Sequence, residues 1–503
     1  MVSYSQVMNR FAPPTPHGAS RPNSVSPQTH SVPARILGAR ATFNRRTSNA
    51  ERLDNRLALV DQGLFAGHRA AGLNLVIQCV WLYEHDVDLD GLRRFNHHLG
   101  YGLLGRRIER SPLPFARPRW VLDRGPSDID VAECARPRAE LSDWADERSQ
   151  LPIDPECGPG WHLGVLPLTD GSTAVTLVLS HYVVDGLGLA IVTADAALGN
   201  TPDLGYPLPH SRTRLRAVVQ DARQTAQDAP DVGRAIVTAA RLARKQARVR
   251  QDVARSPASR PGALRTGNGD DAVVVPAASI QIDLDEWDAR ANALGGNGKT
   301  LIAALGAKLA EGIGRRRAGD GFVTLHLPMS DRAEGDVRAN AMSIASVRVD
   351  PTRVTTDLRD IRAAIKQAVS TLREARDESL QLRALVPFTP KPALKRMVDA
   401  GLTDPDVPML CSNLDEFDPA VVRLDGTDGE LILTRATGQC VTREWLELAG
   451  GQMTMQSWRI RGGSTIYFTV NAYQPGRENT KPALRELVAH TLAEFGLTGT
   501  ITI

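Results

Sequence analysis

Residues 173–186 read TAVTLVLSHYVVDG, and this stretch decides the fold. Its apolar, β-branched opening predicts a buried strand over Ser172–Leu179. The strand pattern ends just before His181, and the apolar run Leu187–Leu198 predicts a helix soon after. A histidine at a strand end is held by rigid backbone, and its near-neutral pKa suits proton transfer at physiological pH. His181 is therefore a candidate catalytic base.

Asp185 and Gly186 lie in the turn between this strand and helix. A carboxylate packed there needs a cationic partner, and Gly186 permits a sharp turn or a close backbone approach to a ligand. The same residues also fit a hydrogen-bonded core histidine, a helix N-cap and a turn glycine. Position and spacing alone leave both interpretations open.

The flanking sequence predicts more of one mixed sheet. Trp161–Leu168 reads as a strand joined to the next by Thr169-Asp170-Gly171, whose Asp-Gly is a hairpin signal. Leu73–Glu84 is apolar enough for a buried strand. A helix is expected from Asp88–Asp90, where either aspartate is an N-cap candidate.

The second half of the chain has a similar content of strands and helices, without a clean sequence repeat. Strands are expected at Ala272–Ile282 (interrupted at Pro276), Phe322–Leu327 (ending at Pro328), Ala341–Val349, Leu431–Thr434, Gly451–Ile460 and Thr465–Tyr473, and helices at Asp285–Ala293, Leu301–Ile313, Leu358–Ala384 and Pro482–Phe495. The pattern predicts a mixed α/β chain of two lobes.

Charge is distributed unevenly along the 503 residues. The net charge is +3, but residues 1–50 carry +6, residues 211–260 carry +8 and the remainder carries −11. We expect a proline-rich, disordered basic arm over 1–50, an N-terminal lobe over 51–210, a basic helical crossover or linker over 211–270, broken near Pro230, and a C-terminal lobe over 271–503.

The composition excludes several classes of protein. With 42% hydrophobic and 23% charged residues the chain is not fibrous or wholly disordered. No apolar run reaches the ~18–20 residues of a membrane span. The cysteines Cys79, Cys134, Cys157, Cys411 and Cys440 are scattered and predict free or buried thiols of a reducing compartment. We expect a soluble cytoplasmic protein, with peripheral membrane contact as an alternative.

Three short motifs resemble phosphate- or metal-binding motifs but do not match them fully. Gly298-Lys299-Thr300 lacks the first glycine of a phosphate-binding loop, and Thr300 fits a helix start. The doublet His97-His98 is on a predicted helix, and Asp425-Gly426 and Asp428-Gly429 lack calcium-loop spacing. We expect no metal site.

The H-x-x-x-D-G of residues 181–186 resembles the H-H-x-x-x-D-G signature of the condensation-domain-like acyltransferases. These include condensation domains of nonribosomal peptide synthetases, wax ester synthase/diacylglycerol acyltransferases, polyketide-associated acyltransferases and, more distantly, chloramphenicol acetyltransferase. Asp90–Ile108, Leu327–Arg332 followed by Asn340, and Cys411–Leu414 are also similar to family segments. The resemblance runs from about Glu51 to the C-terminus and implies two chloramphenicol-acetyltransferase-like lobes in a V with a tunnel between them.

The resemblance implies roles for individual residues. His181 would be the general base, and Asp185 a structural residue paired with Arg332. The backbone near Gly186 and the amide of Asn413 would stabilise an oxyanion. Ser412 and Ser180 would lie near substrate, together with Arg332; Ser180 stands where the family usually has its first histidine. Since the second histidine does the proton chemistry, the base is retained.

These features predict an enzyme that transfers an acyl group from a thioester to a hydroxyl. The favoured donor is acyl-coenzyme A, as co-substrate and without a further cofactor, and the acceptor a lipid or polyketide-type alcohol. One alternative is a stand-alone condensation enzyme that uses acyl or aminoacyl groups on a carrier protein and forms an amide or ester. Another is a non-catalytic condensation-like interaction module.

The basic stretch 211–260 has three interpretations: a solvated surface, attraction for the phosphates of coenzyme A or of a carrier arm, or attachment to an anionic membrane. Nucleic acid is not expected as a partner, because no aromatic residues alternate with the arginines.

Overall fold

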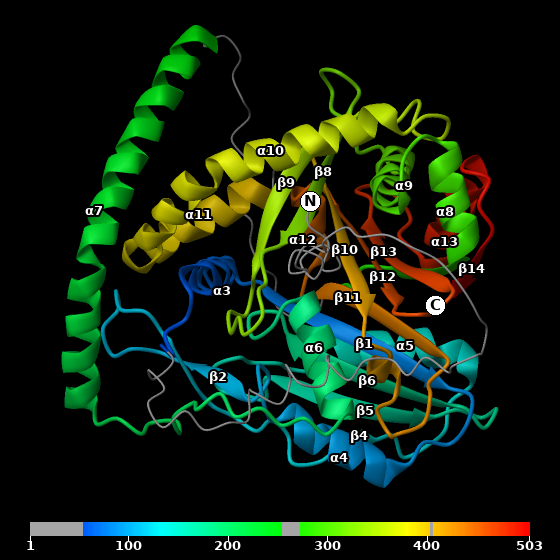
Figure 1. Ribbon diagram of the computed structural model, residues 1–503, viewed down its shortest axis with the longest axis horizontal. Helices are drawn as coiled ribbons and strands as arrows, with labels where there is room; N and C mark the ends of the chain where they lie inside the picture. Colours follow the sequence, from blue (N-terminus) through cyan, green and yellow to red (C-terminus); the bar gives the residue numbers. More distant parts are fainter. Residues whose placement is uncertain (1–53, 254–271, 403–405, 503) are drawn as a thin grey trace, which may run out of the picture. The chain divides into compact units, whose positions relative to one another are not determined.

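The computed structural model describes residues 54–253, 272–402 and 406–502, which belong to one compact unit. The predicted arm over 1–50 and residues 254–270 of the predicted linker lie outside the described residues. Two mixed sheets with covering helices form the unit (Figure 1), which confirms the predicted mixed α/β class.

The first sheet has five strands in the order β11-β1-β6-β5-β4. Their bounds are β1 Asn74–Tyr83, β4 Asp130–Val131, β5 Trp161–Pro167, β6 Thr173–Ser180 and β11 Leu431–Gln439. β1 is antiparallel to both β6 and β11, and β5 and β6 form the expected hairpin, whereas β4 is parallel to β5. β11 comes from the second half of the sequence, so the predicted C-terminal lobe contributes an edge strand to the sheet of the N-terminal half.

The second sheet has seven strands in the order β14-β7-β13-β12-β10-β8-β9. Their bounds are β7 Ala277–Asp283, β8 Val323–Ser330, β9 Met342–Val349, β10 Met409–Phe417, β12 Gln452–Ile460, β13 Thr465–Tyr473 and β14 Gly499–Thr502. β10 runs parallel to both of its neighbours, and the other pairs are antiparallel.

The helices flank the two sheets or pack on one another. They are α3 Leu59–Ala71, α4 Leu89–Leu99, α5 Leu141–Ser149, α6 Gly186–Ala197, α7 Arg214–Val253, α8 Leu284–Ala293, α9 Gly298–Gly312, α10 Arg359–Leu382, α11 Lys391–Leu402, α12 Arg443–Leu448 and α13 Lys481–Glu494. A small hairpin joins β2 Arg106–Glu109 to β3 Arg119–Leu122, and short 3-10 helices are η2 Arg138–Glu140, η4 Arg383–Phe388 and η5 Pro419–Val422.

Polar caps fix where several helices begin. The Asp88 carboxylate accepts a hydrogen bond from the Asp90 N–H at the start of α4. Asn297 and Thr300 form a reciprocal capping box at the start of α9. The phosphate-loop imitation at residues 298–300 is thus a helix start, as its sequence indicates.

Two proline positions differ from the expectation. β8 continues through Pro328. Among the described strands, β10 pairs with β8 only at Leu325 and His326, so the edge of β8 that faces β10 is unpaired at Pro328. Pro230 lies inside α7 and does not end it. Packing of α7 against α10 and η4 offsets the hydrogen bond that this proline removes.

The hydrophobic core joins the two sheets. One large cluster lies between the second sheet and α8, α9, α10 and α13. A second lies between the first sheet and α4 and α6, and it also contains Leu414, Phe417 and Trp458 from the second sheet. No described helix is long and apolar enough to cross a bilayer. All five cysteines are free, with Cys79 and Cys411 buried.

Candidate functional site

His181 follows the last residue of β6 and is held through its backbone on two sides. Its N–H donates to the Leu75 carbonyl of β1 at 3.0 Å. Its carbonyl accepts from the Asn340 side-chain amide at 3.3 Å. Asn340 belongs to residues 331–341, the segment between β8 and β9 that we call the 331–341 loop. The His181 backbone is therefore fixed between the first sheet and a loop of the second.

The imidazole of His181 is half-buried, and burial lowers its pKa below 6.5. Its own backbone carbonyl, the charge of Asp185 and a side-chain interaction with Asn340 act in the opposite direction. Nδ1 of His181 and Oδ1 of Asn340 are both buried and lack a hydrogen-bond partner of normal geometry. These environments favour a neutral imidazole near pH 7, the form that accepts a proton.

Asp185 is the N-cap of α6, and both of its carboxylate oxygens accept hydrogen bonds. One carboxylate oxygen accepts the Gly188 N–H at 2.8 Å, and the other accepts the Ala341 N–H at 2.9 Å. The second oxygen also lies 2.9 Å from the Arg332 guanidinium, and both side chains are 6% exposed. The structure therefore contains the ion pair that the family resemblance implied.

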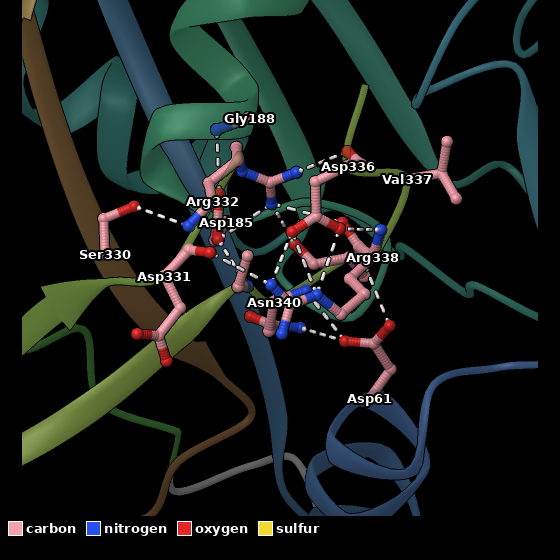
Figure 2. Close-up of polar contacts among 12 residues, drawn as sticks. Asp61, Asp185, Gly188, Ser330, Asp331, Arg332, Asp336, Val337, Arg338 and Asn340 are labelled. Atoms are coloured by element: carbon pink, nitrogen blue, oxygen red, sulfur yellow. Dashed lines mark hydrogen bonds and ion pairs between the residues drawn. The ribbon is translucent and has the colours of Figure 1, made fainter. Parts of the chain in front are cut away.

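Arg332 links this carboxylate to the 331–341 loop (Figure 2). Its guanidinium donates to the carbonyls of Asp336, Arg338 and Ala339 at 3.0–3.1 Å. The pairing of Asp185 with Arg332 thus ties the start of α6 to the loop that holds His181. The Arg332 side chain is 6% exposed, so most of its surface lies against the protein.

Asp61 of α3 is a site residue that the sequence does not reveal. Its buried carboxylate accepts the N–H groups of Ala339 at 2.9 Å and Asn340 at 2.7 Å. Burial raises the pKa of Asp61, while the two backbone hydrogen bonds and the charge of Arg106 act to lower it. An aspartate in an amphipathic helix gives no sequence signal of a contact 278 residues away.

Arg106 of β2 makes a further connection to the 331–341 loop. Its buried guanidinium donates to the Val183 carbonyl at 2.9 Å and to the Val337 carbonyl at 2.6 Å. It also lies 3.9 Å from the Trp120 ring centroid, a cation–π contact. The turn after His181 and the 331–341 loop are thus joined through Arg106 and Arg332, and Asp61 joins the same loop to α3.

A second histidine, His68, contacts the residue that follows His181. His68 of α3 has Nδ1 3.2 Å from the Tyr182 hydroxyl. Burial, and the charge of His181, lower the pKa of His68 to about 4. The sequence does not reveal His68, because it carries no motif and precedes His181 by more than a hundred residues.

Ser180 and Gly186 lie on either side of the His181 turn. Ser180 is fully buried, and its Oγ accepts the Tyr182 N–H at 3.3 Å. Gly186 opens α6 at a point where a Cβ would lie 2.8 Å from Leu414 Cδ2. The start of α6 is therefore in direct contact with β10.

Ser412 and Asn413 lie on β10 next to this contact. The Asn413 amide donates to Asp415 at 3.1 Å, and its oxygen accepts the Asp415 N–H and the Ser457 hydroxyl, both at 3.2 Å. The Ser412 carbonyl accepts from the same hydroxyl at 3.4 Å. The register of β10 shifts between Asn413 and Glu416, and Asp415 has a φ of 58°. Such bulges often occur beside functional sites.

Residues of the other sequence motifs make local structural contacts. Among the described residues no group of histidine, cysteine or acidic side chains is arranged to hold a metal ion. His98 contacts the Ala196 carbonyl through Nδ1 at 2.9 Å, and His97 is exposed. Asp425 accepts the Asp88 N–H at 2.9 Å and has a structural role in its turn.

Comparison with known proteins finds similarity to this chain in structure and not in sequence. No protein-family model matches the sequence, and no curated protein matches it. The first condensation domain of the CDA synthetase superimposes with a TM-score of 0.51 over 90% of this chain and 100% of its own, at 13% identity. The same domain of the calcium-dependent antibiotic synthetase, bound to substrate analogue 2a, gives 0.51 over 87% and 95%, at 15% identity.

A further similar structure is polyketide synthase associated protein 5 from Mycobacterium tuberculosis, with a TM-score of 0.49, 16% identity, and coverage of 87% of this chain and 97% of its own. Identities this low establish the architecture and leave the reaction open. The chain has the two-lobed fold of the condensation domains.

Proposed function

We propose that the chain is an acyltransferase that moves an acyl group from a thioester to a hydroxyl, with His181 as general base. The observation that supports this most strongly is the environment of His181. Its imidazole has a lowered pKa, and its backbone is held by Leu75 and Asn340. Nδ1 interacts with the Asn340 side chain without a hydrogen bond of normal geometry, so the other ring nitrogen, Nε2, is the candidate proton acceptor.

In the proposed reaction the neutral imidazole of His181 carries its hydrogen on Nδ1, beside Asn340, and has its lone pair on Nε2. Nε2 takes the proton of the acceptor hydroxyl as its oxygen attacks the thioester carbonyl carbon. The tetrahedral intermediate collapses, the carbon–sulfur bond breaks, and the thiolate takes the proton back from Nε2. The products are an ester and a free thiol, so His181 ends in its starting state.

The oxyanion of this intermediate needs fixed hydrogen-bond donors. Backbone N–H groups at the start of α6, near Gly186, lie at the positive end of a helix dipole. The side chain of Asn413 is the second candidate donor, and the contact of Gly186 with Leu414 brings its strand to the same region. We propose that Ser180 and Arg332 support this region, since Ser180 is fully buried, the Arg332 side chain is 6% exposed, and both are hydrogen-bonded.

The proposed donor is acyl-coenzyme A and the proposed acceptor a lipid or polyketide-type alcohol. A carrier-bound thioester would undergo the same chemistry at His181, so the donor has to be found by experiment. Purified full-length chain is incubated with a panel of acyl-coenzyme A donors and alcohols, and separately with acylated carrier protein. Thiol release and ester formation are measured by mass spectrometry.

We expect thiol release that depends on alcohol and is lost in His181→Ala. The matched control is His97→Ala, which removes an exposed histidine of α4 and should leave turnover unchanged. Turnover with the carrier alone would replace the donor assignment and keep the base. Turnover that survives in His181→Ala, or no turnover with either class of donor, would overturn the proposed function.

A further inference from the structure

The 40-residue helix α7 carries its charges on opposite sides. Two of its aspartates face the body of the protein. Asp221 is buried and lies 2.8 Å from Arg119 and 2.7 Å from Arg212. Asp228 lies 3.0 Å from Arg56. The acidic side of α7 is thus neutralised by arginines from outside the helix.

The arginines of α7 face the other way. Arg216, Arg223, Arg234, Arg241 and Arg244 are all exposed. Asp231, also exposed, pairs with Arg234. Since the inward aspartates are already compensated, the outward surface of α7 is strongly basic.

An apolar stripe follows the same outward surface. Its large members are Leu215, Val219, Ile236 and Val237, which are 75%, 60%, 56% and 50% exposed. The exposed small residues between and beyond them are Ala222, Ala226, Ala229, Gly233 and Ala240. Spacings of three and four residues place all of these on one face of a helix. We call this set, together with the exposed arginines, the α7 outer face.

The α7 outer face is long enough to meet an extended surface. The stripe from Leu215 to Ala240 is about 39 Å long at 1.5 Å per residue. In Figure 1 α7 lies at the left edge of the ribbon, and α10 and α11 approach it from one side only. The inward face is occupied by contacts with α10 and η4 and by the ion pairs.

We propose that the α7 outer face binds an anionic lipid surface, with the helix lying in the membrane interface. Apolar residues on one face with arginines beside them are the pattern of interfacial helices: the apolar stripe enters the headgroup region and guanidinium groups meet lipid phosphates. Binding in the interface needs no membrane-spanning segment.

Two other binding partners of the α7 outer face are disfavoured by electrostatic repulsion. Residues 1–50 contain six arginines and no acidic residue, so the chain's own arm would be repelled. A second copy would bring two basic faces together, which opposes pairing. An anionic surface is complementary along the whole stripe. This proposal does not rest on the proposed function, since it concerns a surface outside the His181 site.

The test is sedimentation of the full chain with vesicles of phosphatidylcholine alone and of phosphatidylcholine mixed with phosphatidylglycerol. We expect binding to the mixed vesicles only, weakened by added salt. Arg216→Gln/Arg223→Gln/Arg241→Gln should reduce the affinity at least about tenfold, since each juxtamembrane arginine contributes separately. The charge-matched control Arg93→Gln/Arg94→Gln/Arg348→Gln removes exposed arginines of α4 and β9 and should bind as the unmodified chain does.

A second variant, Leu215→Ser/Val237→Ser, keeps the charge and removes apolar surface, and should also bind less. Circular dichroism checks that each variant retains its helix content. Equal binding to neutral vesicles, no binding to either composition, or equal losses in the test and control arginine variants would overturn the proposal. A concentration-dependent dimer that is lost in Leu215→Ser/Val237→Ser would assign the face to a second copy and would overturn it as well.

Discussion

The charge state of a single imidazole determines when the proposed reaction can run. His181 accepts a proton only when it is neutral, and burial holds its pKa below 6.5. Activity should therefore persist as the pH falls below 6.5 and decline only at lower values. The measurement is kcat/KM against pH with a substrate that does not titrate in this range. An acidic limb with its midpoint above 6.5 would contradict this environment for the base.

Asp61 is expected to act through the position of His181. Both of its oxygens accept buried N–H groups from the 331–341 loop, and Asn340 in turn holds the His181 carbonyl. Asp61→Asn leaves only one oxygen acceptor, and a buried N–H left unsatisfied costs about 1–3 kcal/mol. We expect a lower Tm and a fall in kcat with little change in KM. Asp86→Asn, which neutralises an exposed aspartate, is the control, and equal behaviour of the two variants would remove Asp61 from the site.

The sequence reveals residues of the site when they are close neighbours in the chain. His181, Asp185 and Gly186 share one motif, and Arg332 became visible through the family resemblance. Asp61, His68 and Arg106 lie on α3 and β2, and their contacts with the His181 turn and the 331–341 loop are formed only by tertiary folding. No local pattern encodes such contacts.

At the scale of elements, the close approach of α6 to β10 is tested at Gly186. An added Cβ would lie 2.8 Å from Leu414 Cδ2, and overpacking of this kind costs about 1–3 kcal/mol. Gly186→Ala should lower the free energy of unfolding, and Leu414→Ala in the same chain should recover part of the loss. Denaturant unfolding of the two single variants and the double variant measures the coupling.

The control for this cycle is Gly233→Ala, since a Cβ at Gly233 in α7 would meet no atom within 4 Å. It should be neutral or stabilising, because alanine favours a helix over glycine by up to about 1 kcal/mol. Additive effects of Gly186→Ala and Leu414→Ala would show that the two residues do not contact each other.

Strands could be predicted from the sequence where their pattern of apolar and β-branched residues was strong. β1, β5, β6, β12 and β13 are buried, β-branched or alternating segments, and the structure has them within about two residues of the expected bounds. β2, β3, β4 and β14 have four residues or fewer and are stabilised by their partner strands, so their own sequences carry little signal. β11 extends to Gln439, past the predicted Thr434, because β1 offers it a full-length partner.

At the scale of the whole molecule, buried neutral histidines make stability depend on pH. His162 accepts a hydrogen bond from Arg148 at 3.0 Å through Nδ1, and burial, with the charge of Arg148, lowers its pKa to about 4. His68 has a similar value of about 4. The unfolded chain binds these protons near pH 6.5. The contribution of the two residues is therefore complete above pH 6.5 and is lost as the pH falls toward 4.

We expect Tm to fall across this window, and less steeply in His162→Asn, whose side-chain oxygen replaces Nδ1 as acceptor. The control is His97→Asn, an exposed position where the slope should not change. Thermal unfolding at a series of pH values measures both slopes. A variant slope identical to that of the unmodified chain would show that His162 does not titrate in this window.

The pairing of β1 with β11 has a consequence for how the chain is made. Asn74 pairs with Gln439, so β1 emerges from the ribosome hundreds of residues before its partner. At about 5–20 residues per second, the delay is roughly 20–70 s. During this time one edge of β1, an almost wholly buried strand in the finished protein, has no partner and is exposed to aggregation. Nascent chains should therefore bind chaperones until β11 has been synthesised, and a chain truncated before Leu431 should remain insoluble, however complete its HxxxDG motif.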